Sequence, residues 1–114
     1  MEVLRELGTC VELNPISNRC LGYTKDLRTH PGWALMNHGI RCSISSDDPS
    51  IFLNYGGSYD WLWVIIMWDL DLAHIKKLVI NSIEGTDKAE QTMNIWTEKW
   101  NQFVRKIVED AQSA

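Results

Sequence analysis

The sequence predicts an α/β chain that forms part of a larger domain built on parallel strands. Two short segments, residues 9–14 and 40–46, alternate polar and apolar side chains as half-buried strands do. A helical segment lies between them, and further helical segments follow the second strand. Two strands joined through a helix are expected to be parallel neighbours with a right-handed crossover. Because two parallel strands leave both faces and both edges uncovered, the chain is expected to be a piece of something larger.

Composition excludes several classes of protein. The chain has 114 residues, a net charge of -4 and a pI near 5.2, which suit one domain at most and argue against a dedicated nucleic-acid binder. The longest apolar run, residues 61–68, is far shorter than the roughly 20 residues of a membrane span. The N-terminal residues lack the basic region and long apolar core of a signal peptide. Cys10, Cys20 and Cys42 form no C-x-x-C pair, so we expect three ordinary buried thiols.

The first half of the chain supplies the two strands and the helix between them. The strand at 9–14 stops at Pro15, and a polar connection follows it. Pro31 suits the first turn of a helix, which Gly39 closes. The second strand, 40–46, ends directly before an Asp-Asp-Pro sequence. These elements make one strand–helix–strand unit.

The second half is expected to be helical. A glycine-rich bend at 54–58 leads into the Trp-rich run, whose period cannot be read because nearly every position is apolar. From Leu72 the apolar residues fall on one helical face, with Asp71 as the N-cap and Gly85 after the last turn. Asp87 and Glu90 have the spacing of a capping box.

The clearest periodicity in the chain belongs to the closing helix, which we expect over residues 93–111. Large apolar side chains recur there at three- and four-residue steps. Trp96, Trp100 and Phe103 are interpreted as packing residues of a core or an interface, because helical spacing fits that role better than stacking on a ligand.

The residues that carry chemistry are the adjacent acids Asp47 and Asp48. They follow a buried parallel strand, at the edge where barrel and open-sheet enzymes keep their active sites. Burying two carboxylates there is costly unless a metal or a hydrogen-bonding ligand compensates. The alternative is an Asp-Asp-Pro turn whose two acids are solvated, which the spacing alone favours.

Five sequence blocks bear on this choice: ELNPISN (12–18), KDLRTHP (25–31), SSDDP (45–49), SYD (58–60) and NSI (81–83). Their order and spacing resemble the C-terminal part of the adenosine deaminase family. Within that family they are most similar to the adenosine deaminase-related growth factors, which are secreted. The resemblance extends from about residue 9 to residue 110. It identifies the whole chain, 1–114, as a partial adenosine deaminase domain.

This resemblance implies a fold and a reaction. The family fold is a (β/α)₈ TIM-type barrel, and the match places 9–14 on its seventh strand and 40–46 on its eighth, followed by a terminal helix. The implied reaction is hydrolytic deamination of adenosine to inosine at one zinc ion, Zn²⁺. The first acid of the pair is a zinc ligand in the family and maps onto Asp47. The second contacts the purine and maps onto Asp48, so both are the candidate catalytic residues.

The implied zinc site is incomplete in this chain. The family takes its other ligands from a His-x-His sequence and a further histidine upstream, and none of His30, His38 and His74 is placed like a ligand. We therefore expect the 114-residue chain to be inactive alone. The alternative function is a non-catalytic interaction module that acts through its apolar surface. An AMP deaminase relationship fits the residues after the Asp pair less well.

The remaining expectations concern substrate, partners and compartment. The implied partner is adenosine or a related purine nucleoside, with no nucleic acid and no membrane, and the chain is expected to form a homodimer or to associate with the missing part of the barrel. An extracellular location follows if the growth-factor-branch resemblance holds. Asn14 stands where the family commonly has Cys, and the loop at 53–57 lacks the family's small and basic residues, so nucleoside preference stays open.

Overall fold

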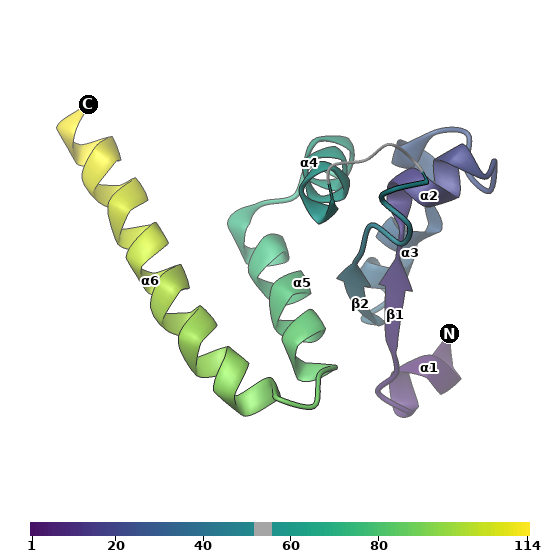
Figure 1. The fold of residues 1–114 in the computed structure, drawn as a ribbon, viewed down its shortest axis with the longest axis horizontal. Coiled ribbons are helices and arrows are strands. Elements are labelled where there is room, and N and C mark those ends of the chain that lie inside the picture. The colour runs from purple at the N-terminus through teal and green to yellow at the C-terminus, as the bar shows by residue number, and fades with distance from the viewer. Residues whose placement is uncertain (52–55) are drawn as a thin grey trace. The chain divides into compact units, whose positions relative to one another are not determined.

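The computed structural model describes residues 1–51 and 56–114, and these form two compact units, Met1–Ser82 and Ile83–Ala114. Figure 1 shows the elements in chain order. They are α1 (Glu2–Glu6), β1 (Cys10–Leu13), α2 (Pro15–Cys20), the 3₁₀ helix η1 (Leu27–Thr29), α3 (Pro31–Asn37), β2 (Arg41–Ile44), α4 (Gly57–Met67), α5 (Leu72–Glu84) and α6 (Ala89–Ser113).

The sheet in the described residues consists of β1 and β2, which pair in parallel as the sequence predicts. Leu13 lies opposite Ile44, and the amide of Ser45 donates to the Leu13 carbonyl at 2.9 Å. Both strands therefore end at the same edge. Each is shorter than expected: β1 spans 10–13 instead of 9–14, and β2 spans 41–44 instead of 40–46. The segments that follow the strands, α2 and the Asp47–Asp48 turn, emerge together at this edge.

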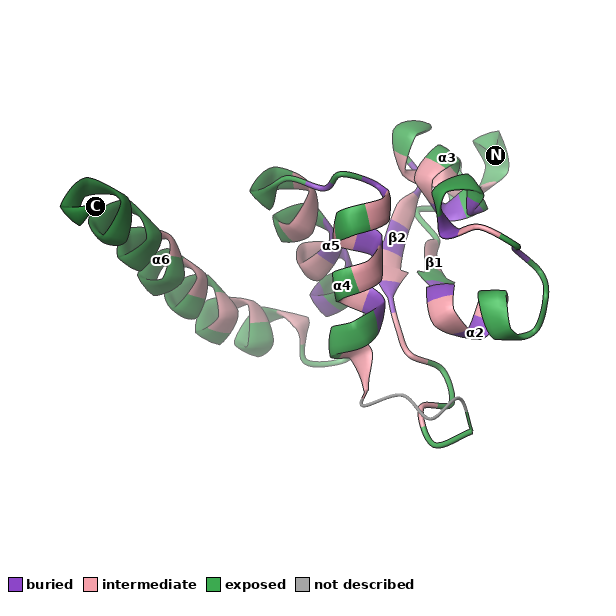
Figure 2. Ribbon diagram, turned by 90° about the horizontal axis from the view of Figure 1, so that it is seen from above, coloured by how far each residue is buried: buried purple, intermediate pink, exposed green. Residues whose placement is uncertain are grey.

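The core of the first unit lies where the sheet meets α4 and α5. Figure 2 shows buried residues on the sides of these helices that face β2. The buried members are Leu13, Ile40, Cys42, Ile44, Val64, Trp68, Leu70 and Leu78. Asn81 of α5 also donates from Nδ2 to the Cys42 carbonyl at 3.0 Å, so a side chain anchors the helix to the strand. The Trp-rich run thus contributes Val64 and Trp68 to the core, while Leu62 and Ile66 stay exposed.

The helix α3 passes close to the sheet at Gly32. A Cβ at this position would lie 2.7 Å from Leu13 Cδ1 and 2.8 Å from the ring of Trp68. Trp68 is itself fixed, because its Nε1 donates to the Leu27 carbonyl at 2.7 Å. The close approach of these elements therefore requires glycine.

Several local predictions are confirmed. Gly39 has a φ of 73° directly after α3, as a helix-terminating glycine should. Asp71 accepts from the His74 amide at 2.8 Å, which makes it the N-cap of α5. The three cysteines are free thiols in the structure, but the expectation that they are buried holds for Cys42 only: Cys10 is half-buried and Cys20 is exposed.

No helix among the described residues is long and apolar enough to cross a membrane.

Other predictions are wrong or lie outside the described residues. Pro15 begins α2 instead of a polar connection, because proline fits the first turn of a helix. The expected capping box of Asp87 and Glu90 does not form: α6 begins at Ala89, and its N-cap residue Lys88 makes no side-chain cap. That start places Glu90 one position too early to reach back to the cap. The bend expected at 54–58 lies partly outside the described residues.

The second unit is formed mainly by α6. Its aromatic residues contact one another along the helix: Trp96 and Trp100 are stacked with ring centroids 5.4 Å apart, and Trp100 and Phe103 lie 5.7 Å apart. None of the helix's residues is buried. Within the second unit these aromatic residues are therefore only partly covered, and their role as packing residues of a core or an interface stays a prediction.

Candidate active site

The Asp pair lies in the turn that follows β2, at the edge where both strands end. Asp47 and Asp48 are both exposed. Asp47 has a φ of 58°, in the left-handed region that aspartate tolerates better than most residues. Its amide lies 3.4 Å from Ser45 Oγ, and the Asp48 carbonyl accepts from the Ile51 amide at 3.0 Å. The backbone therefore turns sharply at Asp47, and that turn sets the direction of its side chain.

A buried serine holds one oxygen of the Asp47 carboxylate. Ser17 of α2 is 1% exposed, and its Oγ donates to Asp47 Oδ2 at 3.0 Å. The other oxygen, Oδ1, accepts no hydrogen bond from a described residue. Carboxylates that ligate metals are commonly held in this way, with one oxygen hydrogen-bonded to the protein. Asp47 thus has one anchored oxygen and one open oxygen.

The connection after α2 is held by a histidine that the sequence leaves without a role. His30 is buried, and its Nδ1 accepts from the Gly32 amide at 3.0 Å. Nε2 therefore carries the proton in the neutral ring and donates to Asn18 Oδ1 at 2.8 Å. Burial lowers the pKa of His30, which favours this neutral form. Because both ring nitrogens form hydrogen bonds, His30 connects α2 with the start of α3.

The other two histidines are also engaged locally. His38 Nδ1 lies 2.7 Å from the carbonyl of Ala34, one turn earlier in the chain. His74 Nδ1 lies 2.7 Å from Asp71 Oδ1 within the first turn of α5. No group of three or more His, Cys, Asp or Glu side chains in residues 1–51 and 56–114 is arranged to hold a metal ion. A metal ion held by Asp47 would therefore need further ligands from outside these residues.

A single carboxylate with an open, exposed oxygen fits a zinc ion as one ligand of several. A second polar group at the same edge also awaits a partner. Asn14 Oδ1, directly after β1, is buried and has no hydrogen-bond partner among the described residues. Buried acceptors are normally satisfied by a protein group or by ordered water, so Asn14 Oδ1 is available to a further donor. Asn14 and Asp47 thus each present an acceptor oxygen after the end of a strand.

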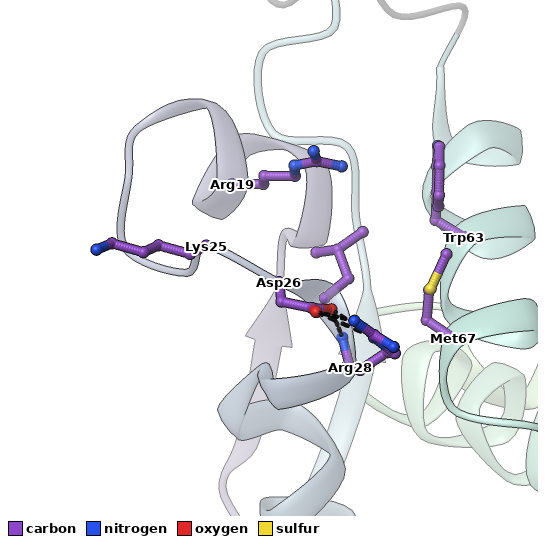
Figure 3. Close-up of a pocket in the computed structure, with 7 residues that line it drawn as sticks. Arg19, Lys25, Asp26, Arg28, Trp63 and Met67 are labelled. Carbon is purple, nitrogen blue, oxygen red and sulfur yellow. Dashed lines mark hydrogen bonds and ion pairs between the residues drawn. The ribbon is translucent and has the colours of Figure 1, made fainter.

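A pocket of about 300 Å³ lies elsewhere in the first unit, between η1 and α4 (Figure 3). Arg28 donates from Nε to both oxygens of Asp26 at 3.0 Å, which lowers the pKa of Asp26 to about 2. In Figure 3 the Lys25 side chain points away from this pair. Neither Asp47 nor Asp48 lines this pocket. The pocket is therefore distinct from the candidate site at Asp47 and Asp48.

Sequence reasoning missed the supporting role of two residues, Ser17 and Asp60. Both belong to the sequence blocks that carry the family resemblance, yet neither was assigned a contact. Asp60 of α4 is 0% exposed, and its Oδ1 accepts from the Ile16 amide at 3.0 Å. The sequence signal for Asp60 is an acid beside the apolar run of α4, because a buried carboxylate needs a hydrogen-bond partner.

Comparisons with known proteins agree on one family. A family model described as "Adenosine deaminase" matches residues 1–98. The chain is 43% identical over 114 residues to "Adenosine deaminase 2" of Dictyostelium discoideum, which covers 95% of this chain and 21% of that protein. It is 38% identical over 104 residues to "Adenosine deaminase 2" of Homo sapiens, covering 85% of this chain and 20% of that protein.

The fold is similar to a solved structure as well. The crystal structure of an adenine deaminase from Arthrobacter aurescens matches with a TM-score of 0.81 at 19% identity, covering 91% of this chain and 32% of that one. This likeness shows the fold, which is consistent with a fragment of a TIM-barrel deaminase. The chain spans about a fifth of the length of the curated relatives that it matches.

Proposed function

The chain belongs to the adenosine deaminase family, and we propose that it forms the C-terminal segment of a zinc-dependent enzyme that deaminates adenosine to inosine. In this proposal β1 and β2 are the seventh and eighth strands of the barrel, and residues 1–114 are a partial deaminase domain. The observation that carries the proposal is Asp47, an exposed carboxylate with one oxygen anchored by Ser17 and the other open.

Asp47 is the proposed zinc ligand of this segment, through Oδ1. Ser17 keeps Oδ2 occupied, so the carboxylate presents one oxygen in a defined direction. When bound, zinc lowers the pKa of a water molecule to roughly 7 and so supplies a nucleophile at neutral pH. The contribution of this chain is the position and charge of Asp47, and its other partners lie outside the segment.

Asp48 is the proposed purine-binding residue. Its main chain is fixed by the hydrogen bond from the Ile51 amide to its carbonyl, which leaves the side chain free to face a ligand. The N7 atom of a purine is an acceptor, so Asp48 must carry a proton to donate to it. Asparagine at this position would keep a donor, whereas alanine would remove it.

The test uses the complete enzyme that contains this segment, with zinc content and steady-state kinetics measured for each variant. Asp47→Asn preserves the left-handed backbone and should weaken zinc binding by more than about 100-fold, since even indirect partners of a metal ligand cost about 10–100-fold. Asp48→Ala should keep zinc and lose turnover, and Asp48→Asn should lose less. Asp69→Asn is the matched control, because Asp69 is another exposed aspartate, with a φ of 50°.

Two outcomes would contradict these assignments. Zinc retained in Asp47→Asn but lost in Asp48→Ala would reverse the two roles. A loss of zinc in Asp69→Asn as large as in Asp47→Asn would show that replacing an exposed aspartate has a general effect, unrelated to ligation.

A second candidate function is a non-catalytic interaction module, for which apolar exposure is the supporting observation. Phe103 and Val108 of α6 are each 48% exposed, and Ile95 is 56% exposed. Exposed apolar patches commonly mark interaction sites. This proposal requires the chain to form a homodimer or to bind the missing part of the barrel. Sedimentation that shows a monomer at every concentration, with cooperative unfolding, would count against it.

We also propose that the complete enzyme acts on adenosine or a related purine nucleoside outside the cell. The support is the similarity to relatives named adenosine deaminase 2 and the resemblance to the secreted growth-factor branch. Secretion of the complete protein from the cells that produce it, with deaminase activity in the medium, is the expected result. Activity confined to the cell interior would contradict it.

A further inference from the structure

Asp60 is the most deeply buried acid among the described residues. It lies in the first turn of α4 and is 0% exposed. Its Oδ1 accepts from the backbone amide of Ile16 at 3.0 Å, across 44 positions of sequence. A carboxylate without solvent is costly unless hydrogen bonds compensate it, so its presence in an apolar helix indicates a specific task.

The hydrogen bond from Ile16 to Asp60 supports the start of α2. This helix begins with Pro15, which has no amide hydrogen, and the side chain of its N-cap residue, Asn14, makes no capping hydrogen bond. The amide of Ile16 is therefore the first donor that needs a partner, and Asp60 supplies it from α4. The position of α2 is thus set by a contact distant in sequence.

The next residue of α2 is Ser17, the donor to Asp47. Ser17 is 1% exposed, so its hydroxyl donates to Asp47 from a position that solvent hardly reaches in this structure. Two hydrogen bonds in series, from Ile16 to Asp60 and from Ser17 to Asp47, connect α4 through α2 to the candidate zinc ligand. Both are 3.0 Å long, and both join segments remote in sequence.

We infer that Asp60 is a positioning residue for Asp47, acting through the backbone of Ile16 and the hydroxyl of Ser17. This inference rests on the proposed function, in which Asp47 ligates zinc. Loss of the Asp60 acceptor frees the start of α2 and lets Ser17 shift, so Asp47 reaches the metal in a broader range of directions. The expected consequence is weaker zinc binding without removal of any ligand.

The experiment measures the zinc dissociation constant of the complete enzyme by competition with a chelator, together with hydrogen exchange of the Ile16 amide. Asp60→Ala removes the acceptor, whereas Asp60→Asn retains an acceptor oxygen in a side chain of the same shape. We expect Asp60→Ala to weaken zinc binding about 10–100-fold, as loss of a ligand's supporting partner typically does. Asp60→Asn should stay within about 3-fold of the parent and keep the Ile16 amide protected.

A mutant cycle tests whether Asp60 acts through Ser17. If it does, Ser17→Ala weakens zinc binding by itself, and adding Asp60→Ala costs little more, because coupled residues are not additive. Val64→Ala is the control for general destabilisation: Val64 is also 0% exposed on α4, but its side chain belongs to the apolar core. It should lower the melting temperature with less than about a 3-fold effect on zinc.

The outcomes separate this inference from the proposed function. Should Asp47→Asn keep its zinc, the proposed function fails. If Asp47→Asn loses zinc while Asp60→Ala binds it no more weakly than Val64→Ala, only the positioning role is overturned. Multiplicative effects of Ser17→Ala and Asp60→Ala also overturn it. If Asp60→Ala does not fold, Asp60→Glu takes its place, since it displaces the carboxylate; unchanged zinc affinity there overturns the inference, and weakened affinity supports it.

Discussion

Asp47 combines a left-handed backbone with a hydrogen bond from a serine that is almost completely buried. A non-glycine residue in this conformation costs of order 1 kcal/mol, less for aspartate than for most residues. The structure around it offsets that cost through the Ser17 contact. The left-handed backbone alone does not distinguish Asp47, since the exposed Asp69 has a φ of 50°. The hydrogen bond from a buried serine is the feature that supports the proposed site over the solvated turn that the spacing alone suggested.

The pH response of His30 is a prediction at the same scale. Burial lowers its pKa below the ordinary value of about 6.5, and its Nδ1 accepts from Gly32, which a protonated ring could not do. As pH falls below about 6.5, the unfolded chain binds a proton that the folded chain resists, so the free energy of unfolding should decrease. This decrease should continue until the folded pKa is reached.

Nuclear magnetic resonance titration of His30, with denaturant unfolding at several pH values, checks this behaviour. His38 is the internal comparison, because it is exposed. A His30 pKa above 6.5, or stability that rises as the solution is acidified through this range, would contradict the account.

At the scale of elements, the strands were predictable and α2 was not. Alternation marks β1 and β2, and their parallel pairing follows from the helix between them. By contrast, α2 is six residues of mixed polarity, too short for a periodic pattern. Its Ile16 amide donates to Asp60, which lies 44 positions later in the sequence, so no local pattern indicates this contact. The start of α6 was also predicted wrongly, because the capping-box spacing of Asp87 and Glu90 does not determine which residue begins the helix.

The residues of the candidate site likewise divide into those that a local sequence pattern reveals and those that depend on contacts remote in sequence. Asp47 and Asp48 could be found from their position after a strand and from the family resemblance. Their support could not, because Ser17 and Asp60 act through contacts between remote segments. His30 is a further example, because its neighbours in sequence do not indicate that its ring hydrogen-bonds both Asn18 and Gly32.

The packing of α3 against the sheet leads to a second prediction. In Gly32→Ala the new Cβ would lie 2.7 Å from Leu13 Cδ1, 2.8 Å from Trp68 Cη2 and 2.9 Å from His30 Nδ1. Overpacking typically costs about 1–3 kcal/mol, more than the gain of up to about 1 kcal/mol from alanine in a helix. The variant should therefore be less stable. Gly57→Ala is the control, since no described atom lies within 4 Å of its Cβ; equal stability changes in the two variants would refute the packing argument.

At the scale of the whole molecule, the fold is consistent with a fragment of a barrel. The described residues form a two-stranded sheet and contribute one anchored carboxylate to the site. A complete barrel takes about 250 residues, and a catalytic zinc site usually takes about three protein ligands. The remaining strands and ligands are therefore needed for the proposed reaction.

We therefore expect that the purified 114-residue chain neither converts adenosine to inosine nor binds zinc stoichiometrically. Asp47 alone leaves too few donors, because a zinc site draws its affinity from several ligands held together. Metal analysis after dialysis and a spectrophotometric deaminase assay test both statements. Stoichiometric zinc with measurable inosine production would show that the segment is self-sufficient and would overturn this view.

The most direct test of the central claim is anomalous diffraction at the zinc absorption edge from crystals of the complete enzyme. We expect an anomalous peak at about 2.0–2.2 Å from Asp47 Oδ1, with Ser17 Oγ still donating to Oδ2 and Asp48 not coordinated to the metal. A peak ligated by Asp48 instead of Asp47, or a zinc ion remote from both residues, would contradict it.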